Sequence, residues 1–263
     1  MRNIAGSVFS YDSVRVGLPS CIVEAKTIPL DRWLRHLRHN LSIARECEDP
    51  EGVHQVRVAT RRIETWLLLA GWHVYRDDLR WLRVEASSAR DVDVLLLRAG
   101  LPKRLKDDLT DHRRTAYGEF LLAAEDPRLQ ALIVGLGALP PLAPTVASTR
   151  MGRLLAKVLE RGKQVSEEQG SLESLHGLRR ALRRLRYGLE LTGGSTASLK
   201  RLQDALGHIN DLAVAIRCLD DLGRGIAPAG FRATLQSELS AARPVALQLW
   251  SNERDRIRLM VAP

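Results

Sequence analysis

The chain of 263 residues is long enough to bury the core of one large domain or of two smaller ones. Its 45% of hydrophobic residues exclude a disordered or fibrous protein, and its 5% of aromatic residues, with Leu, Ala, Arg and Glu abundant, favour helix over strand. The net charge of +9 and the pI near 10.0 indicate a phosphate-rich partner or an anionic lipid surface.

The first helical half is predicted at residues 26–137. Residues 1–25 show no helical period and are predicted to form an irregular arm. From Pro29 onward, apolar residues recur at the spacing of one helix face. Four helices are predicted here, and the helical pattern is interrupted at Asp49-Pro50, Gly71, Gly100 to Pro102 and Asp126-Pro127. The pattern predicts an all-α fold.

A second helical half is predicted at residues 146–255. Residues 138–145 contain three prolines, which cannot continue a helix, so this segment is predicted to be a linker. Residues 256–263 are predicted to be a C-terminal tail. The four helices of this half are predicted near residues 146–168, 172–192, 197–222 and 229–254, with a break from Gly225 to Pro228 before the last.

An internal repeat relates the two halves. The segment His54-Gln-Val-Arg57-Val-Ala-Thr-Arg61-Arg62-Ile-Glu64 aligns at an offset of 122 residues with His176-Gly-Leu-Arg179-Arg-Ala-Leu-Arg183-Arg184-Leu-Arg186, and five of the eleven positions are identical. A chance alignment of two helices would match Leu and Ala, whereas most of these identities fall on charged residues. Nearby offsets pair Arg35 with Lys157, Arg80 with Lys200 and Asp91 with Asp211. One structural unit used twice is indicated.

The repeated segment predicts a basic helix face in each half. On a helix, His54, Arg57 and Arg61 fall within an arc of about 60°. The second copy has a broader basic face, formed by His176, Arg179, Arg180, Arg183, Arg184 and Arg186. A solvated face usually mixes charges, because like-charge neighbours cost a few tenths of a kcal/mol each. A functional surface therefore competes with the simpler interpretation of a solvated face.

Arginine supplies most of the positive charge, with 34 Arg against 6 Lys. The planar Arg fork can hold two phosphate oxygens, which the Lys point charge cannot. A GC-rich genome would explain the total but not the clustering. Stripes with Arg35 and Arg38, and with Lys157 and Arg161, are expected to face the basic helices across a cationic groove. Outside these stripes, at loops or helix ends, we expect Arg76 and Arg224.

No metal, cofactor or membrane segment is indicated. Asp91 and Asp211 have no ligand-spaced His or Glu beside them, so they are predicted to pair with arginines or to cap backbone N–H groups. Cys21, Cys47 and Cys218 show no CxxC spacing, which indicates neither a zinc site nor a disulfide framework. Without an apolar run for a signal peptide or a membrane span, we expect a soluble, cytoplasmic protein.

At these residues the sequence resembles the CHAD family, a helical domain named for its histidines. The resemblance covers roughly residues 26–255 and is carried by the two repeated segments, by Ala89-Arg90-Asp91-Val-Asp93-Val and by Leu202-Gln-Asp-Ala-Leu-Gly207-His-Ile-Asn210-Asp211-Leu. It implies two four-helix bundles related by a pseudo-twofold axis, with a basic central groove that binds inorganic polyphosphate. Residues 1–25 contain no Glu-x-Glu-x-Lys motif of a triphosphate-tunnel domain, so the chain resembles a stand-alone CHAD protein.

The resemblance also implies the phosphate ligands. These are His54, Arg57, Arg61, Arg62, His176, Arg179, Arg183 and Arg184, with Arg35, Arg38, Lys157, Arg161, Arg80 and Lys200 as a second tier. The repeats differ at Gln55 and Gly177 and at Val58 and Arg180, so the two halves need not bind equally. Polyphosphate granules and the enzymes associated with them are further implied partners.

Binding of polyphosphate without catalysis is the function that the sequence favours. No nucleophile and base pair, Gly-rich phosphate loop or metal cluster occurs at a usable spacing. A nucleic-acid-binding protein is the alternative, because the charge and the repeated basic helix also suit a duplex backbone. A polyphosphate hydrolase or kinase is the third, and His54 and His176 are then the only candidates for a catalytic role.

Overall fold

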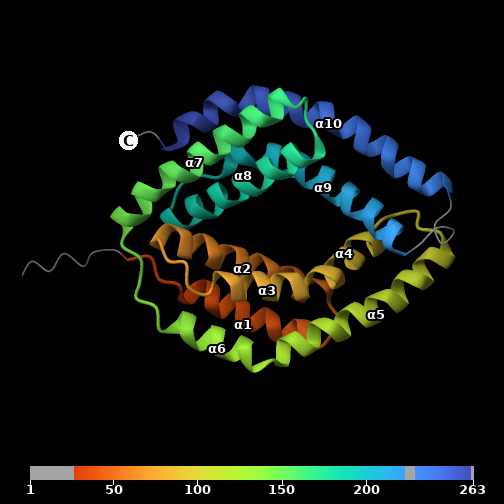
Figure 1. Cartoon of the computed structure of the whole chain (residues 1–263), viewed down its shortest axis with the longest axis horizontal. Helices are drawn as coiled ribbons and strands as arrows, with labels where there is room; N and C mark the ends of the chain where they lie inside the picture. The colour runs from red at the N-terminus through yellow and green to blue at the C-terminus, as the bar shows by residue number, and fades with distance from the viewer. Residues whose placement is uncertain (1–26, 223–228, 262–263) are drawn as a thin grey trace, which may run out of the picture.

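The computed structural model describes residues 27–222 and 229–261, so the predictions for residues 1–25, for Arg224 and for the break before residue 229 lie outside them. The described residues form ten α-helices and two short 3-10 helices, and the predicted all-α fold is confirmed (Figure 1). The α-helices are α1 (Asp31–Arg45), α2 (Pro50–Ala70), α3 (Arg76–Glu85), α4 (Ser87–Leu96), α5 (Lys103–Glu125), α6 (Pro127–Gly137), α7 (Pro144–Glu167), α8 (Leu172–Thr192), α9 (Lys200–Asp221) and α10 (Ala229–Arg258).

The first half has six described α-helices, so the prediction of four is wrong. One added boundary separates α3 from α4 at Ala86. There the carbonyl of Arg83 accepts hydrogen bonds from Arg57 Nη1 at 2.6 Å and from the Ser87 hydroxyl at 2.8 Å. Such back-bonding by Ser bends helices. The other added helix is α6, which begins directly at the break predicted at Asp126-Pro127, with Asp126 as its N-cap.

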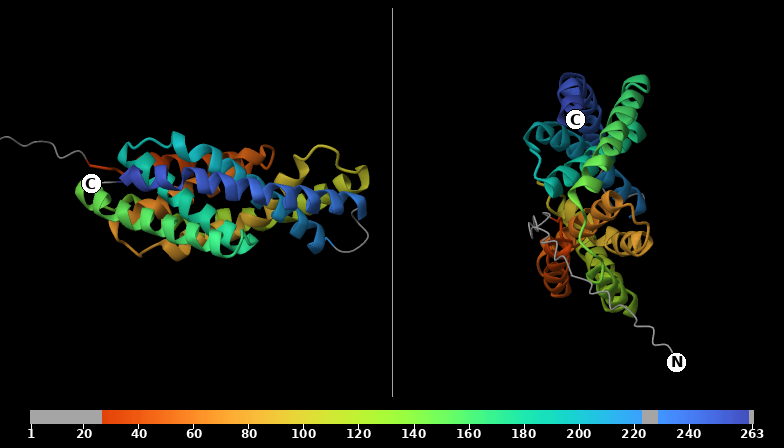
Figure 2. Two further views of the ribbon diagram at one scale, coloured as in Figure 1. Left: turned by 90° about the horizontal axis from the view of Figure 1, so that it is seen from above. Right: turned by 90° about the vertical axis from the view of Figure 1, so that its left-hand side faces the viewer.

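The two halves meet at two places. Helices α1 to α6 form one half and α7 to α10 the other (Figure 1). Near one end of the molecule α2 packs against α8, and near the other end α4 packs against α9. Seen from above, most helices run along the long axis of the molecule (Figure 2). Between the two contacts, the basic faces of the repeated helices are directed at the opposite half.

Apolar side chains hold both contacts. The larger core cluster runs through both halves and includes Leu34, Ile63, Leu182 and Leu202. The smaller one joins α4 and α5 to α9 and α10 through Val92, Leu95, Leu105, Leu109, Leu212, Ala215, Cys218, Leu219 and Leu235. Burial of apolar surface contributes roughly 25 cal/mol per Å². The halves therefore rest on apolar contacts at both ends, and the polar region between them does not have to hold them together.

The two repeated helices begin and end in the same way. Both α2 and α8 have 21 residues. Side-chain oxygens of Asp49 and Ser171 accept hydrogen bonds from the first N–H groups of α2 and α8, and such capping stabilises a helix start. Both helices end at a glycine in the left-handed conformation, Gly71 with φ 78° and Gly193 with φ 79°. The pseudo-twofold relation between the halves stays a prediction.

None of the helices within residues 27–222 and 229–261 has both the length and the apolar character that crossing a membrane requires. In the same residues, no three His, Cys, Asp or Glu side chains come together as a group that could hold a metal ion.

Gly52→Ala is expected to destabilise the protein, because the added methyl group on α2 would push against the backbone of α1. A Cβ atom at this position would lie 2.6 Å from the backbone nitrogen of Ala44 and 2.8 Å from its Cα. Overpacking of this kind costs about 1–3 kcal/mol. Urea denaturation measures the loss as a lower free energy of unfolding.

Gly118→Ala in α5 is the control, because a Cβ atom there meets no atom within 4 Å. This variant should be as stable as the parent, or more stable by about 0.5–1 kcal/mol from helix propensity. Equal stability of Gly52→Ala and the parent would show that the close packing of α1 on α2 is wrong.

Candidate functional site

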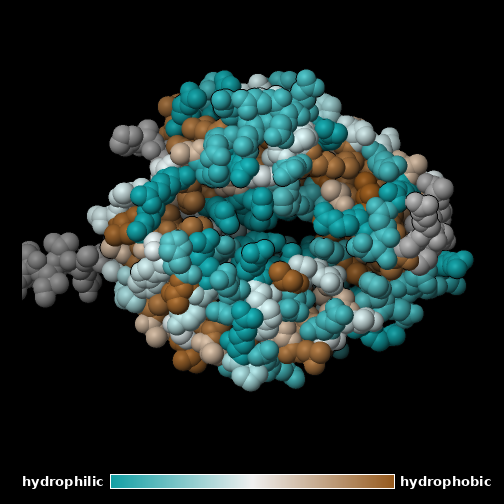
Figure 3. All heavy atoms as spheres, viewed as in Figure 1, coloured by the Kyte–Doolittle hydropathy of each residue, from teal (hydrophilic) through white to brown (hydrophobic). Residues whose placement is uncertain are grey.

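A cavity of about 1020 Å³ lies between the two halves. Helices α2, α3 and α4 line one side and α8 and α9 the other, and hydrophilic side chains surround the opening in the space-filling view (Figure 3). The lining contains eleven arginines, three histidines and four carboxylates. No lysine belongs to the described lining. The cavity therefore has a large excess of positive charge, all of it in side chains suited to bidentate contacts.

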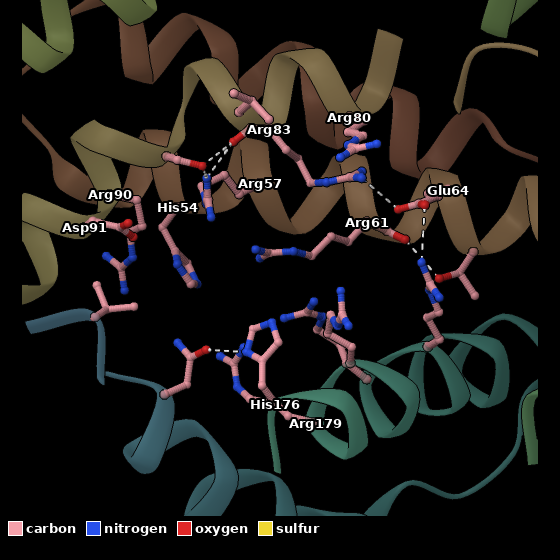
Figure 4. Close-up of a pocket in the computed structure, with 18 of the residues that line it drawn as sticks. His54, Arg57, Arg61, Glu64, Arg80, Arg83, Arg90, Asp91, His176 and Arg179 are labelled. Carbon is pink, nitrogen blue, oxygen red and sulfur yellow. Dashed lines mark hydrogen bonds and ion pairs between the residues drawn. The ribbon is translucent and has the colours of Figure 1, made fainter. Parts of the chain in front are cut away.

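The repeated helices point their basic faces at one another across the cavity. Arg57 and Arg61 come from α2 and Arg179 comes from α8 (Figure 4), and Arg183 of α8 also lines the cavity. The opposite faces of both helices are buried in the core through Val56, Ala59, Ile63, Leu178, Leu182 and Leu185. Because the apolar face of each helix is fixed in the core, its basic face has only the cavity to occupy.

Positive charge is concentrated in the middle of the cavity. Burial lowers the pKa of Arg61, and the charge of Arg183 across the cavity lowers it further. Burial and the neighbouring Arg179 likewise lower the pKa of Arg183. Within the described part of the chain, neither Arg61 nor Arg183 forms a salt bridge. An anion placed here would reduce the repulsion between Arg61 and Arg183 and would give both guanidinium groups a partner.

Carboxylates lie at the two ends of this row of arginines (Figure 4). At one end Glu64 forms salt bridges with arginines of both halves. At the other end Asp91 lies near the charges of Arg57 and Arg217, and burial raises the pKa of Asp91 in spite of them. The acidic groups therefore balance the ends of the cavity and leave its middle cationic.

Both repeated histidines line the cavity. Burial and the nearby charge of Arg90 lower the pKa of His54. Burial and Arg180 lower the pKa of His176, although its Nδ1 forms a hydrogen bond of 3.2 Å with Asn210 Oδ1. Neutral histidines at pH 7 follow from these shifts. Each can then donate one hydrogen bond and accept another.

The structure brings eight of the predicted ligands together and leaves six outside. Those that line the cavity are His54, Arg57, Arg61, Arg80, His176, Arg179, Arg183 and Arg184. Those outside its lining are Arg62, Arg35, Arg38, Lys157, Arg161 and Lys200. Of the eight, Arg57 already donates to the Arg83 carbonyl and the Ser87 hydroxyl, so part of its guanidinium is occupied.

Arg62 joins the two halves instead of lining the cavity. Its guanidinium lies over the rings of Trp33, at 4.4 Å, and Tyr187, at 5.2 Å. It also forms a salt bridge of 3.1 Å with Glu190 of α8. The helical spacing put Arg62 at the margin of the basic face, and in the folded protein that margin packs between α1 and α8.

The other five residues lie outside the cavity lining, and four of them are exposed while Arg161 is half-buried. Lys157 pairs with Glu160 at 2.7 Å and Lys200 pairs with Asp204 at 3.5 Å, both within one helix. Arg161 donates to Gln164. Arg35 and Arg38 are exposed on α1. Arg35 and Lys157 match each other in the repeat, but none of the five residues reaches the cavity.

A family model described as the CHAD domain matches residues 30–220. The chain belongs to the CHAD domain family. The crystal structure of the CHAD domain from the plant Ricinus communis is similar, with a TM-score of 0.61, 27% identity and coverage of 88% of each chain. PptA from Streptomyces chartreusis has the same TM-score at 21% identity, over 86% of this chain and 100% of that one, which shows the fold alone.

Two uncharacterized proteins of Mycobacterium tuberculosis are 28% identical to this chain, and the match covers 63% of it. The match spans 39% of the length of these relatives. The family predicted from the two repeated segments is confirmed by the CHAD domain match.

The CHAD cavity also contains arginines that were not predicted as ligands. These are Arg76, Arg83, Arg90, Arg180 and Arg217. Arg76 does begin a helix, but its expected place outside the basic surface is wrong. The signal was present in the sequence, because Arg76, Arg80 and Arg83 recur at intervals of four and three residues, which puts them on one helix face.

The histidine pKa values predict how the stability of this CHAD domain depends on pH. In the unfolded chain a histidine has a pKa of about 6.5, above the lowered values of His54 and His176 in the folded protein. Below pH 6.5 the unfolded state therefore takes up protons first, and the free energy of unfolding falls until the pH reaches the folded pKa values. Urea denaturation between about pH 5 and 8 measures this loss.

The double variant His54→Gln/His176→Gln should lose less stability than the parent over the same pH range. If the pH profiles of parent and double variant run parallel, the two histidines are not held neutral by the cavity.

Proposed function

We propose that this cavity binds inorganic polyphosphate and does not convert it. One observation carries the proposal: Arg61 and Arg183 line the cavity from opposite halves, burial and neighbouring arginines lower the pKa of each, and no carboxylate of the described residues is among the charges that shift either pKa. The CHAD family is associated with polyphosphate, which agrees with this ligand. Association with polyphosphate granules, or with the enzymes found there, would follow from the same binding.

The chemistry of the lining suits a chain of phosphates. Guanidinium groups donate paired hydrogen bonds to phosphate oxygens, and such charge-assisted bonds are roughly twice as strong as neutral ones. A chain repeats its negative charge at every unit, so donors from α2 and α8 can engage successive phosphates of one molecule. A single orthophosphate cannot bridge the two halves in this way.

Nucleic acid fits the cavity less well. The arginines line a recess of about 1020 Å³ between the halves, and a duplex presents its phosphates on a convex surface that cannot enter such a recess. Proteins that hold single strands stack bases on aromatic rings. Tyr187 is the one Phe, Tyr or Trp side chain in the described lining, and the guanidinium of Arg62 lies over its ring.

Binding without turnover is supported by the state of the polar groups. Glu64 is engaged by arginines, and Nδ1 of His176 is engaged by Asn210. A base that attacks or activates a nucleophile needs a free carboxylate or imidazole positioned against it. The carboxylates of this cavity act instead as counter-ions.

Binding should increase with chain length, because only a chain gains the effective concentration of a second contact. Calorimetry at fixed salt with orthophosphate, pyrophosphate and polyphosphates of defined length measures this. Duplex DNA, single-stranded RNA and ATP should compete weakly, and incubation with Mg²⁺ or Mn²⁺ should release no orthophosphate. Equal affinity per mole for short and long chains would contradict the proposal. Release of orthophosphate from polyphosphate that disappears in a His54 or His176 variant would contradict it as well.

Arg61→Lys and Arg183→Lys should each weaken polyphosphate binding by about 1–3 kcal/mol, because a bidentate, charge-assisted contact is lost while the charge is kept. The same titration measures both variants, and circular dichroism checks their folding. Arg114→Lys is the control, because Arg114 is exposed on α5, pairs with Asp111 and lies outside the cavity. If the lysine variants bind like the parent, binding depends only on the overall positive charge, and the assignment of Arg61 and Arg183 to a specific site is wrong.

A further inference from the structure

Glu64 is an acid among the arginines of both halves. Its Oε2 lies 3.0 Å from Arg83 of α3, and its Oε1 lies 3.5 Å from Arg184 of α8 and 3.9 Å from Arg76. The Glu64 side chain is only 12% exposed. All three arginines line the cavity. A buried carboxylate therefore occupies a point where guanidinium groups from opposite halves converge.

The carboxylate satisfies only part of this set of donors. Arg83 Nη1 and Arg76 Nε are buried and have no hydrogen-bond partner among the described residues. A carboxylate offers two oxygens and one negative charge, whereas the terminal phosphate of a chain offers three non-bridging oxygens and a charge of about −1.5 to −2 at pH 7. The arginines around Glu64 could therefore bind a phosphate, and the carboxylate of Glu64 leaves some of their donors unused.

The repeat shows that this carboxylate is particular to one half. At the offset of 122 residues, Glu64 aligns with Arg186, whose Nε lies 3.4 Å from Glu190 and which is absent from the cavity lining. The second half therefore places no carboxylate at the matching position. The carboxylate of Glu64 makes the two ends of the α2 and α8 faces unequal.

We propose that Glu64 is a built-in anion that takes the last phosphate position of the cavity and so limits how many phosphates one chain can place there. This inference rests on polyphosphate being the ligand. The chain lies on the side of His54, His176 and Arg183, and it stops at Glu64 because a fixed negative charge repels the next phosphate. Arg184 and Arg83 are balanced by Glu64 and contribute little to the ligand. Glu64 is thus a specificity-determining residue.

The variant Glu64→Gln tests the inference on the full chain, with long-chain polyphosphate titrated at several salt concentrations. It should bind about tenfold more tightly, the gain expected from one added charge-assisted contact. The logarithm of the binding constant should also fall more steeply with the logarithm of the salt concentration, by about one unit, because one more phosphate is neutralised.

Glu190→Gln is the matched control. Glu190 also pairs with two arginines, Arg62 and Arg186, at the contact between the halves, but it does not line the cavity. Its variant should keep the affinity and the salt dependence of the parent. If Glu64→Gln behaves like Glu190→Gln or binds more weakly, Glu64 is a structural tie and the inference is overturned. If the parent itself fails to bind polyphosphate, the proposed function is what fails.

Neighbouring arginines of α8 give a second test that does not require Glu64→Gln to fold. Arg183→Gln should weaken binding and reduce the salt dependence by about one unit, because its charge is not balanced by a carboxylate. Arg184→Gln should reduce the salt dependence clearly less than Arg183→Gln, because Glu64 already balances Arg184. An equal reduction in both variants would overturn the inference.

Discussion

The repulsion between Arg61 and Arg183 across the contact of α2 with α8 is the constraint that the rest of the structure accommodates. Both guanidinium groups are largely removed from water, and each lacks a salt bridge within the described residues. Burying a charge without a partner is costly. The fold must therefore supply that free energy elsewhere, and the site regains part of it when an anion enters.

Apolar packing supplies this free energy at both ends of the cavity. The larger core cluster passes through both halves beside α2 and α8, and the smaller one closes the far end between α4 and α9. Two cross-connections act next to the arginines: Arg62 with Glu190, and Arg184 with Glu64. The first is packed against Trp33 and Tyr187 and keeps the halves together, while the second lies in the cavity.

Most of the fold could be predicted from the sequence, because apolar periodicity and Gly or Pro breaks act locally. The boundary at Ala86 could not, because it depends on Arg57 reaching the carbonyl of Arg83 from another helix. The cavity lining could be predicted where the repeat marked it, as at His54 and His176. Arg217 has no such mark, since only the packing of α9 against α4 brings it to the cavity.

The repeat also misled where a match in sequence did not bring a match in surroundings. Arg62 and Arg184 are equivalent in the alignment, yet Arg62 is fixed between aromatic rings and Arg184 faces the cavity with 44% of its side chain exposed. At another aligned pair the residue type itself differs: Val58 of the first half is uncharged, whereas Arg180 of the second half adds a positive charge to the cavity. Two similar helices therefore build an unsymmetrical site: α2 contributes a carboxylate near one end, and α8 contributes additional arginine. Because electrostatic fields add, two helices that begin and end alike can bound a cavity whose two ends differ in charge.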